Sequence, residues 1–220
     1  MKLRLKSSFW EPWHCAFDSD GHEFRLMTNE GPNRKEMVSI FKMVGLQTPI
    51  FGYYSDFVKI KYEKERKVVV YDDIESHFGK NKRLVTFSEL NVEDKLLYMS
   101  EYIQTLQRPL AQYISRSTRY LFVGDYGFQY DYLSHNDWRS NNGRVDFTPL
   151  MRLDVPEWRK QIPYAMFAID FVGEQYELKA IDLNIAPGTI GIGLQHFLSS
   201  TQMVLSIKDW LRKYMSGEYE

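Results

Sequence analysis

Three oxygen-bearing side chains near the carboxyl end of the chain lie in apolar segments. Asp170 lies within AMFAIDFV, Asp182 follows twelve residues later within KAIDLN, and Asn184 comes two residues after Asp182. A buried carboxylate is costly unless something pairs with it, and oxygen ligands completed by phosphates and water are those that Mg²⁺ prefers. We therefore predict a metal site at these three residues. The alternative is that each acid only accepts hydrogen bonds from nearby backbone N–H groups.

Whether Asp170 and Asp182 lie close together depends on the register of the strands that carry them. Segments 164–172 and 176–184 each predict a strand, and a hairpin would bring both carboxylates to one point, with Asn184 on the same face. Directly opposite placement needs a hairpin centred near Tyr176, whereas the turn residue Gly173 favours an earlier centre. An odd offset would place the acids on opposite faces of the sheet.

The remaining segments alternate between helix and strand patterns, which indicates an α+β fold in one unit. A helix that Asn33 caps and Gly45 ends has apolar residues at helical spacing. Other helices are predicted over 56–65, 92–106 and 195–214, with a short one between Pro156 and Pro163. Strands are predicted over 68–71, 83–87, 110–114 and a hairpin within 119–133 that turns at Gly124–Asp125 or Tyr126–Gly127.

Composition and charge exclude several classes of protein. The 220 residues are 44% hydrophobic and 15% aromatic with a formal net charge of −1, so the chain is an ordinary globule and nucleic acid is not implied as a partner. The single cysteine, Cys15, rules out an internal disulfide and favours a reducing compartment. There is no apolar signal-peptide core and no membrane-spanning stretch, so we expect a cytoplasmic protein.

The order of several motifs resembles that of a known superfamily. The segment DWRSN (137–141), followed by Asp170, Asp182-x-Asn184 and Pro187-Gly188, resembles the carboxy-terminal half of ATP-grasp ligases, especially the branch that adds glutamate to ribosomal proteins. Upstream, three further segments resemble parts of the same fold: PNRKEMVSIFKMVGLQTP (32–49), the adenine-holding strand and hinge PLAQYI (109–114), and RYLFVGD (119–125). The resemblance implies a compact ATP-grasp fold, in which two α+β lobes hold ATP between them.

This resemblance also implies a division of the chain and a set of roles. The expected parts are a reduced amino-terminal cap (1–50), an amino-terminal lobe (51–109) and a carboxy-terminal lobe (110–220). Two Mg²⁺ ions held by the three oxygen-bearing residues would neutralise the ATP phosphates while a substrate carboxylate attacks the γ-phosphoryl group. An amine would then displace phosphate from the acyl phosphate. The implied site residues are Arg139 and Asn141 for catalysis, Gln112, Tyr113, Ile114 and Arg119 for the nucleotide, and the backbone amides of Gly188 and Thr189 as further donors.

The phosphate contact departs from the family pattern. By length and element order, VVVY (68–71) matches the strand that normally ends in a phosphate-binding Lys, which puts Tyr71 in that position. Lys80 and Lys82 in the following loop can supply the missing charge. A second alignment instead uses Lys59 or Lys61, from a segment whose simplest interpretation is a charged, solvated face.

Three functions remain open from the sequence. The leading prediction is an ATP-dependent carboxylate-amine ligase acting on an unidentified carboxylate and an amine acceptor, such as an amino acid, a peptide or a protein terminus. The second is an ATP-binding assembly or regulatory factor that does not ligate, which the atypical phosphate loop favours and the retained Arg139 and Asn141 oppose. The third is a purely structural α+β protein.

Overall fold

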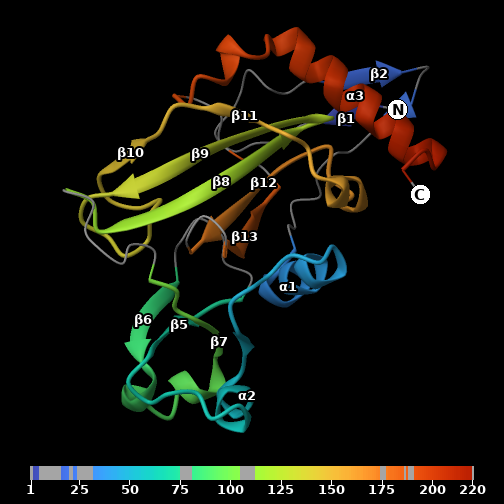
Figure 1. Ribbon diagram of the computed structural model, residues 1–220. Helices are drawn as coiled ribbons and strands as arrows, with labels where there is room; N and C mark the ends of the chain where they lie inside the picture. Colours follow the sequence, from blue (N-terminus) through green and yellow to red (C-terminus); the bar gives the residue numbers. More distant parts are fainter. Residues whose placement is uncertain are drawn as a thin grey trace.

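The chain folds into two lobes, one above the other in Figure 1. The computed structural model describes residues 2–4, 16–19, 22–23, 32–74, 81–104, 112–173, 177–185, 187 and 191–219. The lower lobe holds a four-stranded sheet and the upper lobe a six-stranded sheet. No helix among these residues is long and apolar enough to cross a membrane.

The lower lobe is an antiparallel sheet with short helices. Its strand order is β4-β7-β5-β6, and its elements are β4 (Phe51–Gly52), α2 (Tyr54–Lys59), β5 (Lys67–Tyr71), β6 (Lys82–Thr86), the 3-10 helices Phe87–Glu89 and Asp94–Leu96, and β7 (Tyr98–Glu101). Val68 and Val70 of β5 are fully buried and pack with Phe57 of α2 and Met99 of β7. β5 therefore lies inside the sheet, paired on one side with β6 and on the other with β7.

The upper lobe is built on a long hairpin. β8 (Ser115–Val123) and β9 (Tyr126–Ser134) pair over their whole length, and β10 (Val145–Phe147) and β11 (Met151–Leu153) both pair with β9. β12 (Met166–Val172) joins β8 to the edge strand β13 (Lys179–Asn184). Gly124 turns the hairpin with a φ of +58°, as the sequence predicts.

Helices cover both faces of this sheet. α3 (Ser200–Ser216), preceded by the 3-10 helix Leu194–His196, packs Ile207 and Trp210 against Leu121 and Ala168. On the other face, α1 (Arg34–Met43) packs Met37 and Phe41 against a core that also holds Phe167 and Ile169. The 3-10 helix Glu157–Gln161 leads into β12. α1 thus shares a core with the upper lobe, although it falls within the predicted cap.

A small separate sheet stands at the amino terminus. Its strands are β1 (Lys2–Arg4), β2 (Ala16–Ser19) and β3 (His22–Glu23), paired antiparallel in that order. The division of the chain at residues 50 and 109 stays a prediction, since the structure gives sheets and cores rather than boundaries.

Most predicted elements are confirmed, but the helix over 92–106 is wrong, and residues 112–114 of the predicted strand 110–114 lie just before β8 and form no strand of their own. The helices at Asn33 and at the carboxyl end and the strands around VVVY and RLVTF are present, and the predicted helix 56–65 is shorter, at Tyr54–Lys59. The predicted helix over 92–106 is instead the 3-10 turn Asp94–Leu96 followed by strand β7. All four residues of β7 are buried because this strand fills the place between β4 and β5, so pairing in the sheet overrides the helical spacing of the sequence.

The register between β12 and β13 determines whether Asp170 and Asp182 lie on the same face of the sheet. Asp170 pairs directly with Asp182, and a β-bulge follows, because Phe171 pairs with Ala180 and leaves Ile181 as the extra residue. A bulge inserts one residue into one strand and shifts the pairing beyond it. The strand pairs on both sides of the bulge are centred close to residue 176 rather than near Gly173, and the bulge places the two acids directly opposite each other.

Candidate functional site

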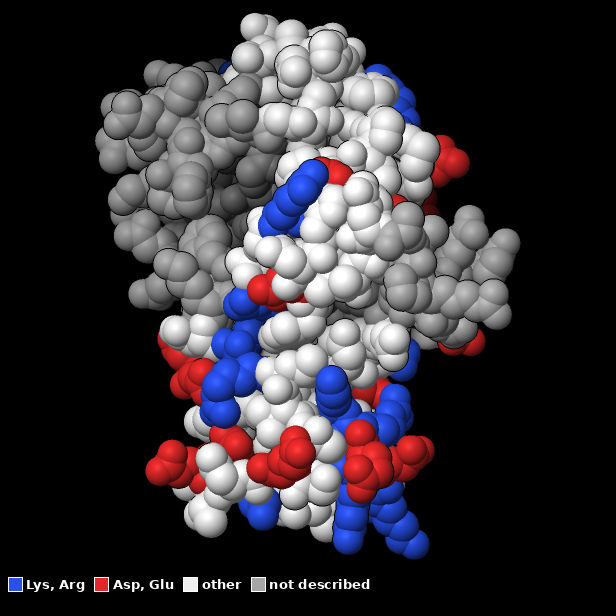
Figure 2. Space-filling view, turned by 90° about the vertical axis from the view of Figure 1, so that its left-hand side faces the viewer, with Lys and Arg blue, Asp and Glu red and all other residues white. Residues whose placement is uncertain are grey.

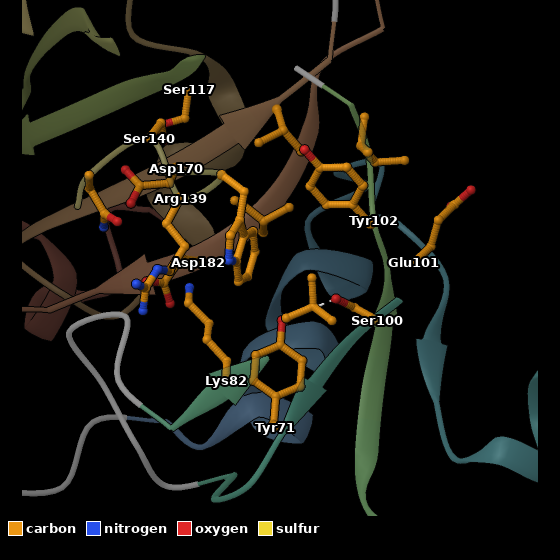
Figure 3. A pocket seen from close by; sticks show the side chains of 16 residues that line it. Tyr71, Lys82, Ser100, Glu101, Tyr102, Ser117, Arg139, Ser140, Asp170 and Asp182 are labelled. Atoms are coloured by element: carbon orange, nitrogen blue, oxygen red, sulfur yellow. Dashed lines mark hydrogen bonds between the residues drawn. The ribbon is translucent and has the colours of Figure 1, made fainter. Parts of the chain in front are cut away.

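A cleft lies between the two sheets, with an empty volume of about 650 Å³ that includes open solvent at its mouth. Both lobes line it (Figure 3). The lower lobe contributes Val69, Tyr71, Lys82 and the run Ser100–Ile103, and the upper lobe contributes Ser117, the run Trp138–Asn141, Asp170, Val172, Ile181 and Asp182.

One row of charged side chains crosses three adjacent strands at the base of the cleft. Arg119 of β8 pairs across the sheet with Asp170 of β12, which pairs with Asp182 of β13. Arg119 donates from Nε to Asp170 Oδ1 at 2.6 Å and from Nη2 to Oδ2 at 2.7 Å, and both side chains are buried. The carboxylate raises the pKa of Arg119 well above its usual value against the effect of burial. Arg119, predicted as a nucleotide ligand, thus engages the acid predicted as a metal ligand.

The second acid is paired by a residue that the sequence did not single out. Arg34, the first residue of α1, donates from Nη1 to Asp182 Oδ1 at 2.5 Å. Its guanidinium lies 5.1 Å from the ring centroid of Tyr71 in the lower lobe. Burial opposes ionisation of Asp182, but the Coulomb attraction of Arg34 and then Lys82 lowers the pKa of Asp182 below its usual value. Only 4% of the Arg34 side chain is exposed, so this arginine lies behind the cleft wall and contacts both lobes.

Lys82 reaches into the cleft from the lower lobe. It begins β6 and pairs across the sheet with Tyr71, the residue that the first of the two alignments predicts at the position of the phosphate-binding Lys. Figure 3 shows its ammonium group pointing toward Asp182 and Arg139. Burial lowers the pKa of Lys82 to about 8, although the charges of Asp182 and Asp170 act to raise it. Among the described residues, Lys82 makes no ion pair within 4.0 Å, and its ammonium lies 6.0 Å from the centroid of the Trp138 ring.

The other candidate lysines do not line the cleft in the described part of the chain. Lys59 lies on α2 with 75% of its side chain exposed and pairs with Asp56, and Lys61 is exposed just beyond that helix. Lys80 lies outside the described residues. Of the four lysines considered from the sequence, Lys82 is therefore the one whose position in the cleft is established.

The loop after β9 presents Arg139 and Asn141 to the cleft. Arg139 donates from Nε and Nη2 to the two oxygens of Asp137, at 2.9 and 2.8 Å, and its hydrogen bonds lower the pKa of Asp137 to about 2. Asn141 is exposed at the cleft wall. The structure thus brings both predicted catalytic residues to the cleft, with Arg139 held by its neighbour in the chain.

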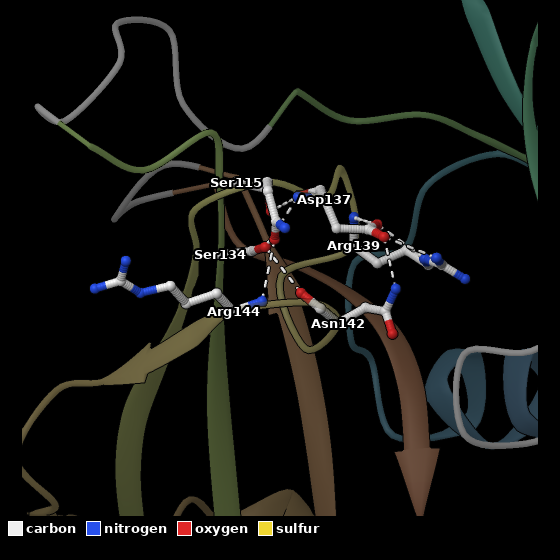
Figure 4. Close-up of polar contacts among 7 residues, drawn as sticks. Ser115, Ser134, Asp137, Arg139, Asn142 and Arg144 are labelled. Carbon is white, nitrogen blue, oxygen red and sulfur yellow. Dashed lines mark hydrogen bonds and ion pairs between the residues drawn. The ribbon is translucent and has the colours of Figure 1, made fainter.

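Buried serines hold this loop in place (Figure 4). Ser115 Oγ donates to the Asp137 carbonyl at 2.6 Å, and Ser134 Oγ donates to the Asn142 carbonyl at 2.9 Å while accepting from the Asp137 N–H. Deeper in the cleft, Ser140 Oγ donates to Ser117 Oγ at 2.5 Å. Since both strand serines are fully buried at the end of the rigid β8–β9 hairpin, the backbone of the loop is fixed before any ligand arrives.

The described part of the predicted adenine segment, residues 112–114, does not line this cleft. Gln112, Tyr113 and Ile114 lie at the start of the long hairpin, where Tyr113 donates to Asp146 and Ile114 is 53% exposed, and none of the three lines the cleft. The last strand of the lower lobe is β7, so the run Ser100–Ile103 crosses from that lobe toward the upper one and lines the cleft instead. The sequence contains two similar candidates for the adenine-holding segment, SEYI (100–103) and AQYI (111–114).

Two of the three predicted metal ligands, Asp170 and Asp182, line the cleft. Asn184 lies two residues beyond Asp182, hence on the same strand face, but is not among the cleft-lining residues. No group of three or more His, Cys, Asp or Glu side chains among the described residues is arranged to hold a metal. The hydrogen bond that Asp182 accepts from Arg34 reaches Oδ1, and no other described residue is seen to donate one to Oδ2. Gly188 and Thr189 lie outside the described residues.

Cationic side chains also gather outside the cleft. Figure 2 shows Lys and Arg following one another down the middle of one face, from the upper lobe to the lower, with acidic side chains concentrated at the lower end. A formal net charge of −1 therefore conceals a cationic strip, and a strip of this kind attracts anionic ligands.

Comparison with known proteins identifies the fold. No family model matches the sequence, and no curated protein matches it. Among solved structures, macrocyclase MdnC bound with precursor peptide MdnA, from Microcystis aeruginosa MRC, has a TM-score of 0.56 and 16% identity over 86% of this chain and 65% of that one. The ATP-grasp ligase PsnB complexed with its minimal precursor has a TM-score of 0.51 and 10% identity over 84% and 61% of the two chains.

A third structure agrees with these two. The Chryseobacterium gregarium RiPP-associated ATP-grasp ligase, in complex with ADP and a leader and core peptide, has a TM-score of 0.51 and 14% identity over 81% of this chain and 59% of that one. The chain thus spans about three fifths of the length of these structures. The two sheets, the cleft between them and these three matches lead to one conclusion: the chain has the fold of ATP-grasp ligases.

Proposed function

We propose that the protein is an ATP-dependent ligase that joins a carboxylate to an amine through an acyl phosphate. The observation that carries the proposal is the convergence of Lys82, Arg139 and the acids Asp170 and Asp182 on one cleft between the two sheets. Fixed cations beside a cleft between two lobes suit phosphoryl transfer, because the protein contributes mainly positioning and charge stabilisation to this reaction.

In this proposal the nucleotide lies between the sheets. The adenine ring packs among the apolar side chains of Val69, Ile103, Val172 and Ile181, and the backbone of the Ser100–Ile103 run supplies its polar contacts. The phosphates extend toward Lys82, whose ammonium has no other ion-pair partner among the described residues. In this proposal Tyr71 occupies the position of the family's phosphate-binding Lys, and its cross-strand neighbour Lys82 supplies the positive charge for the phosphates.

The reaction follows in two displacements. A carboxylate oxygen bonds to the γ-phosphorus while the bond from that phosphorus to the β–γ bridging oxygen breaks, and ADP leaves. The amine then attacks the acyl carbon, inorganic phosphate departs and the amine proton is lost to solvent. Arg139 binds the carboxylate and the charge that develops on the acyl phosphate through its planar fork, and Asn141 donates beside it. Mg²⁺ held by Asp182, Asp170 and Asn184 would neutralise phosphate oxygens.

The proposed substrate class is a peptide carboxylate. The three similar structures were solved with precursor or leader and core peptides, and the cleft wall beside Arg139 offers Trp138 and Tyr102, whose rings meet edge to face at 6.0 Å. Aromatic walls of this kind bind the apolar parts of a peptide while an arginine holds its carboxylate.

A second function is favoured by one contact. Arg139 already binds both oxygens of Asp137, so its fork is engaged before a substrate arrives. An ATP-binding assembly or regulatory factor of the same fold would keep the nucleotide contacts and leave Arg139 in this internal pair.

Turnover separates the two functions. The protein is incubated with ATP, Mg²⁺, pooled acidic peptides and pooled amino acids, and ADP and phosphate are quantified. The ligase proposal expects release that depends on the pool and is abolished in Asp182→Ala. Nucleotide binding without release against any pool, seen as a rise in melting temperature with ATP and Mg²⁺, would favour the regulatory factor.

A further inference from the structure

The two acids at the base of the cleft already have their countercharges. Both oxygens of Asp170 accept hydrogen bonds from the buried guanidinium of Arg119. An arginine does not lose its proton at any pH that a folded protein meets, so this neutralisation is permanent. Asp170 therefore offers a metal ion lone pairs without a net negative charge.

Asp182 is neutralised from outside the cleft. Arg34 is not among the cleft-lining residues and reaches Asp182 Oδ1 from behind, while Asp182 lines the wall with 19% of its side chain exposed. The stack on Tyr71 and the hydrogen bond from the Arg34 backbone N–H to the Ile74 carbonyl, at 3.1 Å, fix the guanidinium in this place. A ligand entering the cleft does not displace Arg34, because Tyr71 and Asp182 stand between them.

Lys82 adds a further cation on the open side. Three cations, Arg34, Arg119 and Lys82, thus surround two acids, Asp170 and Asp182. Divalent cations bind most strongly where carboxylates remain unpaired, since their own charge is the largest in such a site. An excess of fixed positive charge instead opposes each divalent ion that enters, and it opposes a second ion more than the first.

We propose that the cleft binds its nucleotide with a single Mg²⁺ ion, and that Arg34, acting through Asp182, removes the charge that would hold a second one. The inference rests on the proposed nucleotide-binding function. Asp182 would hold this ion together with the other two predicted donors, and phosphate oxygens and water would complete its ligands. Arg34 thus supplies one fixed positive charge next to Asp182, where a second divalent cation would otherwise bind.

The number of bound ions tests the inference directly. Mn²⁺ replaces Mg²⁺, and electron paramagnetic resonance measures the free ion during titration of the protein with a saturating non-hydrolysable ATP analogue. We expect about one bound Mn²⁺ for each chain-bound nucleotide. Two bound ions in the unaltered protein would overturn the inference and leave the proposed function intact, whereas failure of the analogue to bind with any divalent ion would overturn both.

Substitutions at α1 identify the residue responsible. Arg34→Gln removes the countercharge of Asp182, and we expect a second Mn²⁺ to bind, whereas Arg34→Lys keeps the charge and should bind one ion. Lys35→Gln is the matched control, because it removes the same charge from the next residue of the helix, whose side chain is exposed and lies over Tyr53. Equal ion counts in Arg34→Gln and the unaltered protein would refute the role of Arg34. Circular dichroism at each titration point verifies that the variants compared are folded.

Discussion

Nucleotide affinity should depend on pH through Lys82. Burial lowers the pKa of this lysine to about 8; Asp182 and Asp170 raise it, and Arg34 and Arg139 lower it further. About nine tenths of the ammonium groups are then charged at pH 7 and about one tenth at pH 9. If the phosphates bind only to the charged form, the apparent affinity scales with that fraction. We therefore expect affinity for a non-hydrolysable ATP analogue to fall about tenfold between pH 7 and pH 9.

The assay is isothermal titration calorimetry at constant ionic strength and Mg²⁺, repeated at half-unit steps of pH. Lys82→Met should bind weakly at pH 7 and show little further loss toward pH 9. Lys59→Met is the matched control, since Lys59 is exposed on the lower lobe and serves the alternative alignment. A flat profile in the unaltered protein, a tenfold fall that persists in Lys82→Met, or an equal loss in Lys59→Met would each refute the assignment of the phosphate contact.

Three further outcomes follow from the structure. Arg119→Met removes the partner of the buried Asp170 and should lower the free energy of unfolding by about 3–5 kcal/mol. The double variant Arg119→Met with Asp170→Leu should recover most of that loss. Urea unfolding that shows no recovery in the double variant would contradict this account. Gly124→Ala should lower the melting temperature more than Gly45→Ala, although both glycines have a positive φ. A Cβ atom at residue 124 would lie against Ser206 Oγ and 2.5 Å from the Ser206 carbonyl oxygen, whereas a Cβ atom at residue 45 would meet nothing described within 4 Å. Lys82 also makes the free energy of unfolding of the nucleotide-free protein rise with pH between about 8 and the ordinary lysine pKa of 10.5. In this pH range the unfolded chain binds more protons than the folded one. Lys82→Met should therefore remove that rise, as measured by chemical denaturation.

The strands that carry the acids could be predicted from the sequence, but their register could not. AMFAIDFV and KAIDLN are apolar and β-branched enough to indicate strands. The pairing of Asp170 with Asp182 depends on a bulge at Ile181, and no turn residue marks that position. A bulge arises from the fit of the whole edge strand to its neighbour, which local patterns do not contain.

The sequence analysis missed one site residue and one site segment, for different reasons. Arg34 follows the helix cap Asn33, where a basic residue is ordinary, and its partner Asp182 is 148 positions away. The Ser100–Ile103 run was placed inside a predicted helix because Leu96, Leu97 and Ile103 recur at helical spacing. Burial of VVVY between two strands demands a partner on each side, and this long-range requirement turns the segment into β7.

Trapping of the acyl phosphate tests the central claim most directly. Hydroxylamine replaces the amine in a reaction with ATP, Mg²⁺ and pooled acidic peptides, and mass spectrometry quantifies peptide hydroxamates beside the ADP released. We expect hydroxamate and ADP in equal amounts, both abolished by Lys82→Met and by Arg139→Met. A protein that binds the ATP analogue yet forms neither product with any peptide would contradict the assignment of this cleft as a ligase site.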